Sequence, residues 1–115
     1  MGKLTTHVLD TASGKPGAGV RIRLYGLADG RELLTSAITN SDGRTDSPLL
    51  DVKSFQAGTY ELEFSIGDYF KANGARQSEP PFLDDVLIRV TLSRDEHYHV
   101  PLLASPWSYS TYRGS

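Results

Sequence analysis

Short segments of alternating polarity, separated by turn residues, constrain the fold of this chain most. In the clearest segment, every second residue from Tyr60 to Ile66 is large and apolar, and the residues between them are polar. A period of two is typical of a β-strand with one buried face. Further strands are expected at residues 4–10, 20–25, 32–39, 86–91, 97–103 and 108–112. Turn residues cluster between them, which predicts an all-β, two-sheet antiparallel sandwich.

One helix is expected at residues 67–74, between two of the strands. Asp68 stands near its start, and Gly74 is a suitable stop. The chain has 115 residues, which fits a single domain spanning residues 1–115.

Charge and cysteine content argue against several classes of protein. The 12 basic and 14 acidic residues give a net charge of −2, so no basic field indicates nucleic-acid binding. Apolar runs are too short to span a bilayer. There are no cysteines, which excludes disulfides and cysteine-based zinc sites. Neither a signal peptide nor a peroxisomal address is recognisable, so we expect a cytoplasmic protein.

Histidines supply the first candidate functional residues. His97 and His99 share one face of an expected strand, and His7 shares a strand face with Thr5. Such histidines can ligate zinc, act as acid and base, or simply be solvated. A metal site lacks a carboxylate or cysteine partner at ligand spacing, so we expect no metal.

The remaining candidates are Arg44 and the C-terminal segment. Arg44 follows an Asp-Gly turn, where an arginine is usually solvated. Residues 108–115 are dense in hydroxyls and aromatics, and on their own they indicate an exposed strand that could pair with another chain. The sequence has no Gly-rich phosphate loop and no Gly-x-Ser-x-Gly motif.

Taken together, these segments resemble the 5-hydroxyisourate hydrolase family. The run His-Tyr-His-Val-Pro-Leu-Leu at 97–103 and the Tyr-Arg-Gly-Ser ending at 112–115 look like the signature of that family. Thr6 to Asp10 and Ser41 to Arg44 match its opening strand and its arginine loop. The likeness covers essentially the whole chain, and its two ends are the most specific parts.

The resemblance implies a transthyretin-like sandwich of about eight strands with one short helix. It also implies a dimer formed by sheet extension and a homotetramer of two dimers around a central channel. The active site would lie where the dimers meet. Transthyretin, a hormone carrier, lacks the histidine pair and the Tyr-Arg-Gly-Ser ending, so the resemblance favours the enzyme.

The implied activity is hydrolysis of 5-hydroxyisourate to 2-oxo-4-hydroxy-4-carboxy-5-ureidoimidazoline in urate degradation, without metal or cofactor. By matched motif, the catalytic residues would be His7, Arg44, His99 and Ser115. Substrate contacts would come from His7, Arg44, Tyr112, Arg113 and Gly114. His97 would have a secondary role. The resemblance leaves open which histidine is the general base.

Two other functions are compatible with the same fold. One is a transthyretin-like carrier of small ligands without catalysis. The other is a noncatalytic sandwich module like the carboxypeptidase-regulatory domains, which share the Gly-rich first half but not the two ends.

Overall fold

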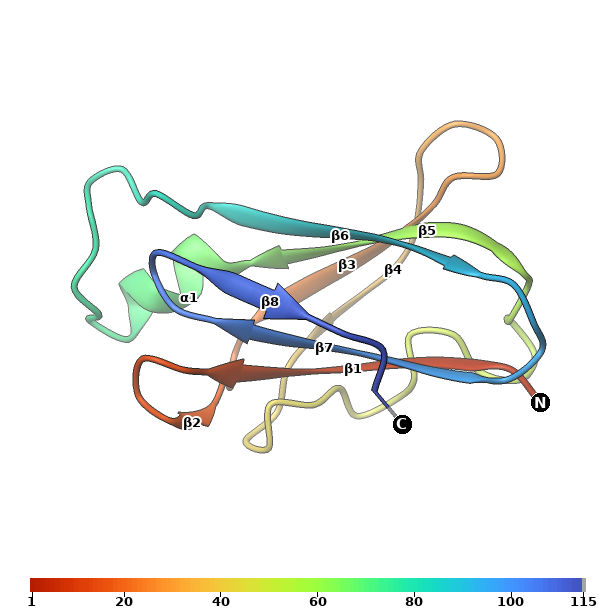
Figure 1. Cartoon of the computed structure of the whole chain (residues 1–115), viewed down its shortest axis with the longest axis horizontal. Helices are drawn as coiled ribbons and strands as arrows, with labels where there is room; N and C mark the ends of the chain where they lie inside the picture. The colour runs from red at the N-terminus through yellow and green to blue at the C-terminus, as the bar shows by residue number, and fades with distance from the viewer. Residues whose placement is uncertain (115) are drawn as a thin grey trace.

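The computed structural model describes residues 1–114, which fold into two four-stranded sheets. The strand orders are β2-β1-β7-β8 and β4-β3-β5-β6 (Figure 1). The elements are β1 (Lys3–Asp10), β2 (Lys15–Pro16), β3 (Arg21–Gly26), β4 (Glu32–Ile38), β5 (Gly58–Ser65), α1 (Ile66–Ala72), β6 (Asp85–Leu92), β7 (His97–Ala104) and β8 (Tyr109–Thr111). The expected all-β sandwich of eight strands and one short helix is confirmed.

The core lies between the two sheets, where apolar side chains from both sheets meet. Val8 and Leu102 project from one sheet, and Leu24 and Phe64 from the other, each with 1% or less of its surface exposed. Each such side chain contributes about 1.5–3 kcal/mol of transfer free energy on burial. The alternating pattern of the sequence therefore specifies which face of each strand points inward.

One pair of strands departs from the expected antiparallel arrangement. β1 and β7 run parallel along their full length, with Thr5 opposite His99 and His7 opposite Pro101. The other pairs of named strands are antiparallel within residues 1–114. Strand direction depends on the path of the intervening chain, which local alternation does not report. This pairing brings the beginning of the chain beside residues 97–104.

Two local elements also differ from expectation. Lys15 and Pro16 form the two-residue strand β2 on the edge of β1, where the sequence indicated only a turn. A two-residue strand is too short to show a period. Helix α1 begins at Ile66 and ends at Ala72, and Gly74 follows with φ of +67°, a backbone conformation that favours glycine.

Within residues 1–114, no helix has the length and apolar character needed to cross a membrane.

Candidate active site

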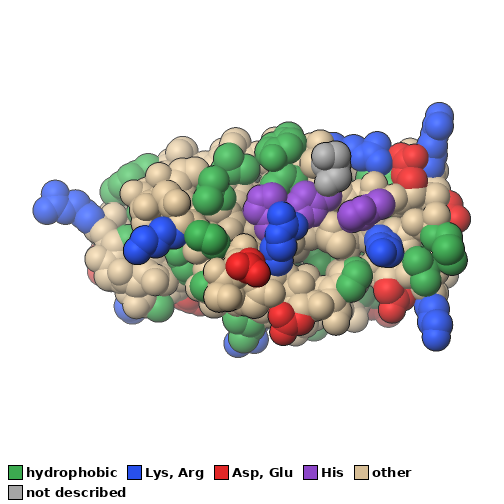
Figure 2. All heavy atoms as spheres, turned by 90° about the horizontal axis from the view of Figure 1, so that it is seen from below, with side chains coloured by type: hydrophobic (Ala, Val, Ile, Leu, Met, Phe, Trp, Pro, Cys, Tyr) green, Lys and Arg blue, Asp and Glu red, His purple; other side chains and the backbone are tan. Residues whose placement is uncertain are grey.

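The outer face of the β2-β1-β7-β8 sheet carries the three histidines of the chain. His7 lies on β1, and His97 and His99 lie two residues apart on β7. Their positions alternate with core residues, so the three side chains point away from the other sheet. Figure 2 shows the histidine side chains gathered along this face, beside a basic side chain.

A short contact joins His7 and His99. His7 Nδ1 and His99 Nε2 are 2.6 Å apart, and the two ring centroids are 4.8 Å apart. The two residues are 92 positions apart in sequence, and the parallel pairing of β1 with β7 brings them together. His99 is only 7% exposed, whereas His97 is exposed. The pair thus lies in a partly enclosed part of the sheet face, and His97 lies at its solvent side.

Thr5 connects the two histidines of β7. Its Oγ1 lies 2.7 Å from His97 Nε2 and 2.8 Å from His99 Nδ1, and both are hydrogen-bonding distances. Sequence reasoning placed Thr5 on the face of His7 but did not select it as a site residue. The signal that it missed was the register of β1 and β7, which sets Thr5 directly opposite His99.

Arg44 reaches the histidines from a tight loop that packs on β1. Gly43 has φ of +74°, and a Cβ there would lie 2.5 Å from the carbonyl oxygen of Val8, so only glycine fits. The Val8 N–H donates to Gly43 O at 2.8 Å, and the Arg44 N–H donates to Asn40 Oδ1 at 3.2 Å. Arg44 also forms a β-bridge with His7. These contacts fix the arginine beside the histidine pair.

Burial and the nearby arginine keep both paired imidazoles neutral. Burial, together with the smaller effects of the charges of His7, Arg44 and His97, lowers the pKa of His99 to about 4. Burial also lowers the pKa of His7, with a smaller effect from Arg44. A neutral imidazole can accept a proton, so the pair can act as a base near neutral pH.

A cavity of about 260 Å³ opens beside this cluster. It is lined by Thr5, Thr6, Arg44, Thr45, Asp46, Ser47, Pro48, His97 and His99. A larger hollow of about 600 Å³ lies between β6 and β7, and none of the three histidines is among the described residues that line it. The chemistry-bearing residues therefore surround the smaller cavity.

Gly114 closes one side of the histidine pair. Its N–H donates to the carbonyl oxygen of His99 at 2.7 Å, and a Cβ on Gly114 would lie 2.7 Å from His99 Cδ2. The structure thus brings Gly114 to the cluster through its backbone. Ser115, expected to be catalytic, lies outside the described residues.

Arg113 and Tyr112 have other surroundings in the single chain. The Arg113 guanidinium donates to Glu96 Oε1 at 2.8 Å and to the His97 carbonyl oxygen at 3.2 Å, and it lies 4.2 Å from the centre of the Tyr98 ring. Tyr112 follows β8 and is 59% exposed. Their roles as substrate contacts stay predictions.

Residues 1–114 contain no group of three or more His, Cys, Asp or Glu side chains arranged to hold a metal ion. The three histidines lie in a row rather than around a common point: His7 contacts His99, and Thr5 stands between His99 and His97. Metal independence stays a prediction.

The fold and the site define a two-sheet β-sandwich with a histidine–arginine site on the outer face of one sheet. The chain belongs to the HIUase/Transthyretin family, whose model matches residues 4–114. It is 54% identical to the 5-hydroxyisourate hydrolase of Pseudomonas aeruginosa, with 100% of this chain and 93% of that protein covered. It is 59% identical to the 5-hydroxyisourate hydrolase of Deinococcus radiodurans, with 97% and 95% covered.

Solved structures agree with this assignment. The 5-hydroxyisourate hydrolase of Klebsiella pneumoniae matches with a TM-score of 0.81 and 31% identity over 98% of this chain and 99% of that one. (S)-allantoin synthase matches with a TM-score of 0.94 and 47% identity over 99% of this chain, which spans 44% of the length of that protein. Transthyretin from Sparus aurata matches with a TM-score of 0.85 and 27% identity, over 97% of this chain and 96% of that one.

Proposed function

We infer that this chain hydrolyses 5-hydroxyisourate, opening its six-membered ring to give 2-oxo-4-hydroxy-4-carboxy-5-ureidoimidazoline in urate degradation. Relatives that are 54% and 59% identical over nearly their whole length bear the name of this enzyme. The observation that carries the inference is the contact of His7 with His99 beside Arg44, in which burial keeps both rings neutral. Such a pair can remove a proton from water as the water attacks a ring amide carbonyl.

We propose His7 as the residue that deprotonates the water. Both ring nitrogens of His99 have partners, His7 at Nε2 and Thr5 at Nδ1. Within residues 1–114, His7 makes a hydrogen bond through Nδ1, and Nε2 has no partner. His7 Nε2 is therefore the ring nitrogen of this pair that is able to receive a proton from a bound water. His99 then orients His7 and shares the proton that it accepts.

Arg44 would bind the carbonyl oxygens of the substrate and stabilise the oxyanion formed by water attack. A guanidinium is planar, permanently charged and suited to paired hydrogen bonds with oxygens. Charge stabilisation of this kind is worth about 10²–10³ in rate for a single donor. The leaving ring nitrogen takes up a proton from His7 as the bond between carbon and nitrogen breaks.

The proposal includes a homotetramer that completes the site with residues from more than one subunit. In both sheets, the strands at one edge of the sandwich, β6 and β8, are paired on one side only within the described chain. Such edges can extend the sheets into a neighbouring copy. Tyr112 and Arg113 follow β8, so that assembly would set their surroundings.

A carrier of small ligands on the same fold is the competing function. Freshly prepared 5-hydroxyisourate, followed by its ultraviolet absorbance, separates the two. The enzyme accelerates the decay of the substrate far above the spontaneous rate, whereas a carrier binds a ligand without accelerating it. If the wild-type protein does not accelerate the decay of 5-hydroxyisourate, the proposed function is wrong.

Three further parts of the proposal have their own tests. Treatment with a chelator should leave turnover unchanged, and a loss that zinc restores would contradict metal independence.

A short polar extension after Ser115 should lower turnover if the carboxylate expected there pairs with the histidines or Arg44. Normal turnover of the extended protein would remove Ser115 from the site. Cell fractionation tests the expected cytoplasmic location.

A further inference from the structure

A continuous row of hydrogen bonds runs from the buried histidine pair to the surface. His7 Nδ1 lies 2.6 Å from His99 Nε2, His99 Nδ1 lies 2.8 Å from Thr5 Oγ1, and Thr5 Oγ1 lies 2.7 Å from His97 Nε2. His97, the last member, is exposed to solvent. All three distances are within hydrogen-bonding range, and the contact between the two rings is short.

The number of available hydrogens makes this row directional. A neutral imidazole carries one N–H, and a hydroxyl carries one O–H, so each member can donate along the row only in one direction at a time. In one arrangement, every donor points from His7 toward His97, and His7 Nε2 is left with a lone pair. In the reverse arrangement, every donor points toward His7, whose own hydrogen then lies on Nε2.

The proposed reaction needs such a path, and the inference rests on that proposed function. Hydrolysis of a ring amide at neutral pH gives a carboxylate and an N–H group of a ureide, which stays uncharged. The attacking water supplies two protons, and the leaving nitrogen keeps only one. The other is lost when the new carboxylic acid ionises. Until the ring bond breaks, the proton taken from the water has no acceptor but the histidine pair, whose charged form burial disfavours, so it must be passed outward and returned later.

We propose that Thr5 and His97 form the exit path for this proton. His7 Nε2 takes a proton from the attacking water, and the hydrogen on His7 Nδ1 moves to His99 Nε2. The hydrogen on His99 Nδ1 moves to the Thr5 oxygen, and the Thr5 hydroxyl hydrogen moves to His97 Nε2. His97 Nδ1 releases its hydrogen to solvent. Each member accepts one proton and gives one up, so the row ends neutral and reversed. When the ring bond breaks, the hydrogen on His7 Nε2 passes to the leaving nitrogen, solvent returns a hydrogen to His97 Nδ1, and the hydrogens of the row move back, which restores the first arrangement.

The charged groups that face the row lie at its two ends. Arg44 lies at the inner end and opposes a proton held on His7 or His99. At the outer end, Glu96 precedes His97 and is paired with Arg113, which also donates to the His97 carbonyl. Lys3 stands opposite His97 in register. His97 is exposed, so water can take the released proton directly. Thr5 and His97 do not contact the substrate in this scheme and act through the histidine pair.

The test compares kcat of Thr5→Val, Thr5→Ser and His97→Ala in dilute and in concentrated imidazole buffer, with a blank lacking protein. A general acid–base group contributes about 10²–10⁴-fold, and loss of its exit path should cost less, about tenfold in kcat, with KM unchanged. Thr5→Ser should keep the rate of the wild type because it keeps the hydroxyl. Imidazole should restore the kcat of His97→Ala, because it can replace the missing ring at the solvent end of the row. It should not restore the kcat of Thr5→Val, because the missing hydroxyl lies inside the row.

Thr11→Val is the matched control, since the Thr11 hydroxyl donates to the Ala104 carbonyl, away from the histidine cavity, and takes no part in the row. It should keep the kcat of the wild type. Normal kcat in both Thr5→Val and His97→Ala would overturn the exit path. A loss in Thr5→Val with His97→Ala unaffected would also overturn it, because Thr5 would then only orient His99. Wild-type protein without turnover would instead contradict the proposed function.

Discussion

At the scale of single residues, the two histidines of the pair have unequal surroundings. His99 has a partner at each ring nitrogen and a neighbouring glycine against its ring, whereas His7 keeps one nitrogen without a partner within residues 1–114. Replacing His99 therefore removes contacts to His7 and Thr5 at once. Replacing His7 removes the proposed base and leaves the contact of Thr5 with His99 in place.

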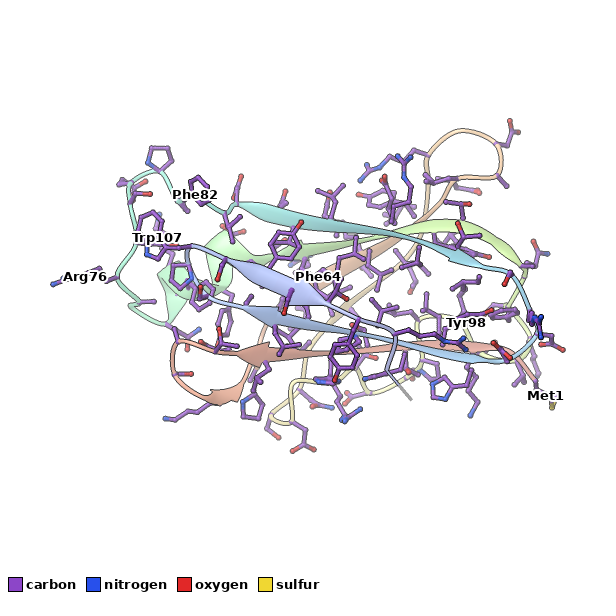
Figure 3. The ribbon with its side chains drawn as sticks, in the orientation of Figure 1. Met1, Phe64, Arg76, Phe82, Tyr98 and Trp107 are labelled. Atoms are coloured by element: carbon purple, nitrogen blue, oxygen red, sulfur yellow. The ribbon has the colours of Figure 1, made fainter. Side chains whose placement is uncertain are left out.

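Substitution of the cluster should abolish most activity without unfolding the protein. His7→Ala, Arg44→Ala and His99→Ala should each lower kcat/KM by at least about a hundredfold, the scale of a lost acid–base or oxyanion group. The ultraviolet turnover assay measures the loss, and circular dichroism checks the fold. Arg76→Ala is the matched control for Arg44, because Arg76 is exposed at the far end of the molecule (Figure 3). Near-normal turnover of the His99 variant would contradict the assigned pair.

Stability should also depend on the protonation of His99. Its pKa is near 6.5 in the unfolded chain and about 4 in the folded protein. Between these values the unfolded state binds more protons, so the free energy of unfolding falls as pH drops from 6.5 toward 4. The contribution is fully present above that window. Urea denaturation across this range should show a weaker pH dependence in His99→Gln than in the wild type. Equal slopes would show that His99 is not the source.

At the scale of elements, the site depends on backbone segments that pack against the two strands. Gly43 places the Arg44 loop on β1, and Gly114 lies against His99 on β7. In both places the approach is too close for a Cβ. The geometry of the site thus depends on glycine backbone contacts as well as on the histidine and arginine side chains.

Gly114→Ala should test this dependence. Its new Cβ would lie 2.7 Å from His99 Cδ2, so the ring or the segment must move. A displacement of about 1 Å can cost on the order of a hundredfold in rate, and we expect a loss of that order in kcat. Gly26→Ala is the control, because Gly26 lies on β3, in the sheet without histidines, and its Cβ would meet only the flexible end of Leu34 on β4. Wild-type kcat in Gly114→Ala would show that the His99 ring tolerates the shift.

Alternation along the chain predicted the strands and the face of each histidine, but not the assembly of the site. It correctly placed His97 and His99 on one face. It did not indicate that one is exposed and the other buried, because depth is set by His7 and Gly114, which are distant in sequence. Family resemblance selected Arg44, whose loop alone looked solvated. Neither approach selected Thr5, whose role follows only from the register of β1 with β7.

At the scale of the whole molecule, we expect four copies arranged with two-fold symmetries. A chain of 115 residues builds a thin core, and burial between subunits adds stability that depends on concentration. Light scattering should give the mass of a tetramer, and activity should fall on dilution together with that mass. A monomer with full activity would contradict a site that is shared between subunits.

Parallel pairing of β1 with β7 makes the ability to turn over substrate a late event in the life of each chain. The pair of histidines is 92 positions apart, so its two halves meet only after nearly the whole sequence has been synthesised and has collapsed. Contacts of such long sequence separation are slow to form, because the entropy of closing the loop must be overcome first. Recovery of turnover after dilution from denaturant should therefore lag behind the recovery of β-structure in the other sheet, and a ribosome-bound chain that stops before residue 97 has no means of catalysis.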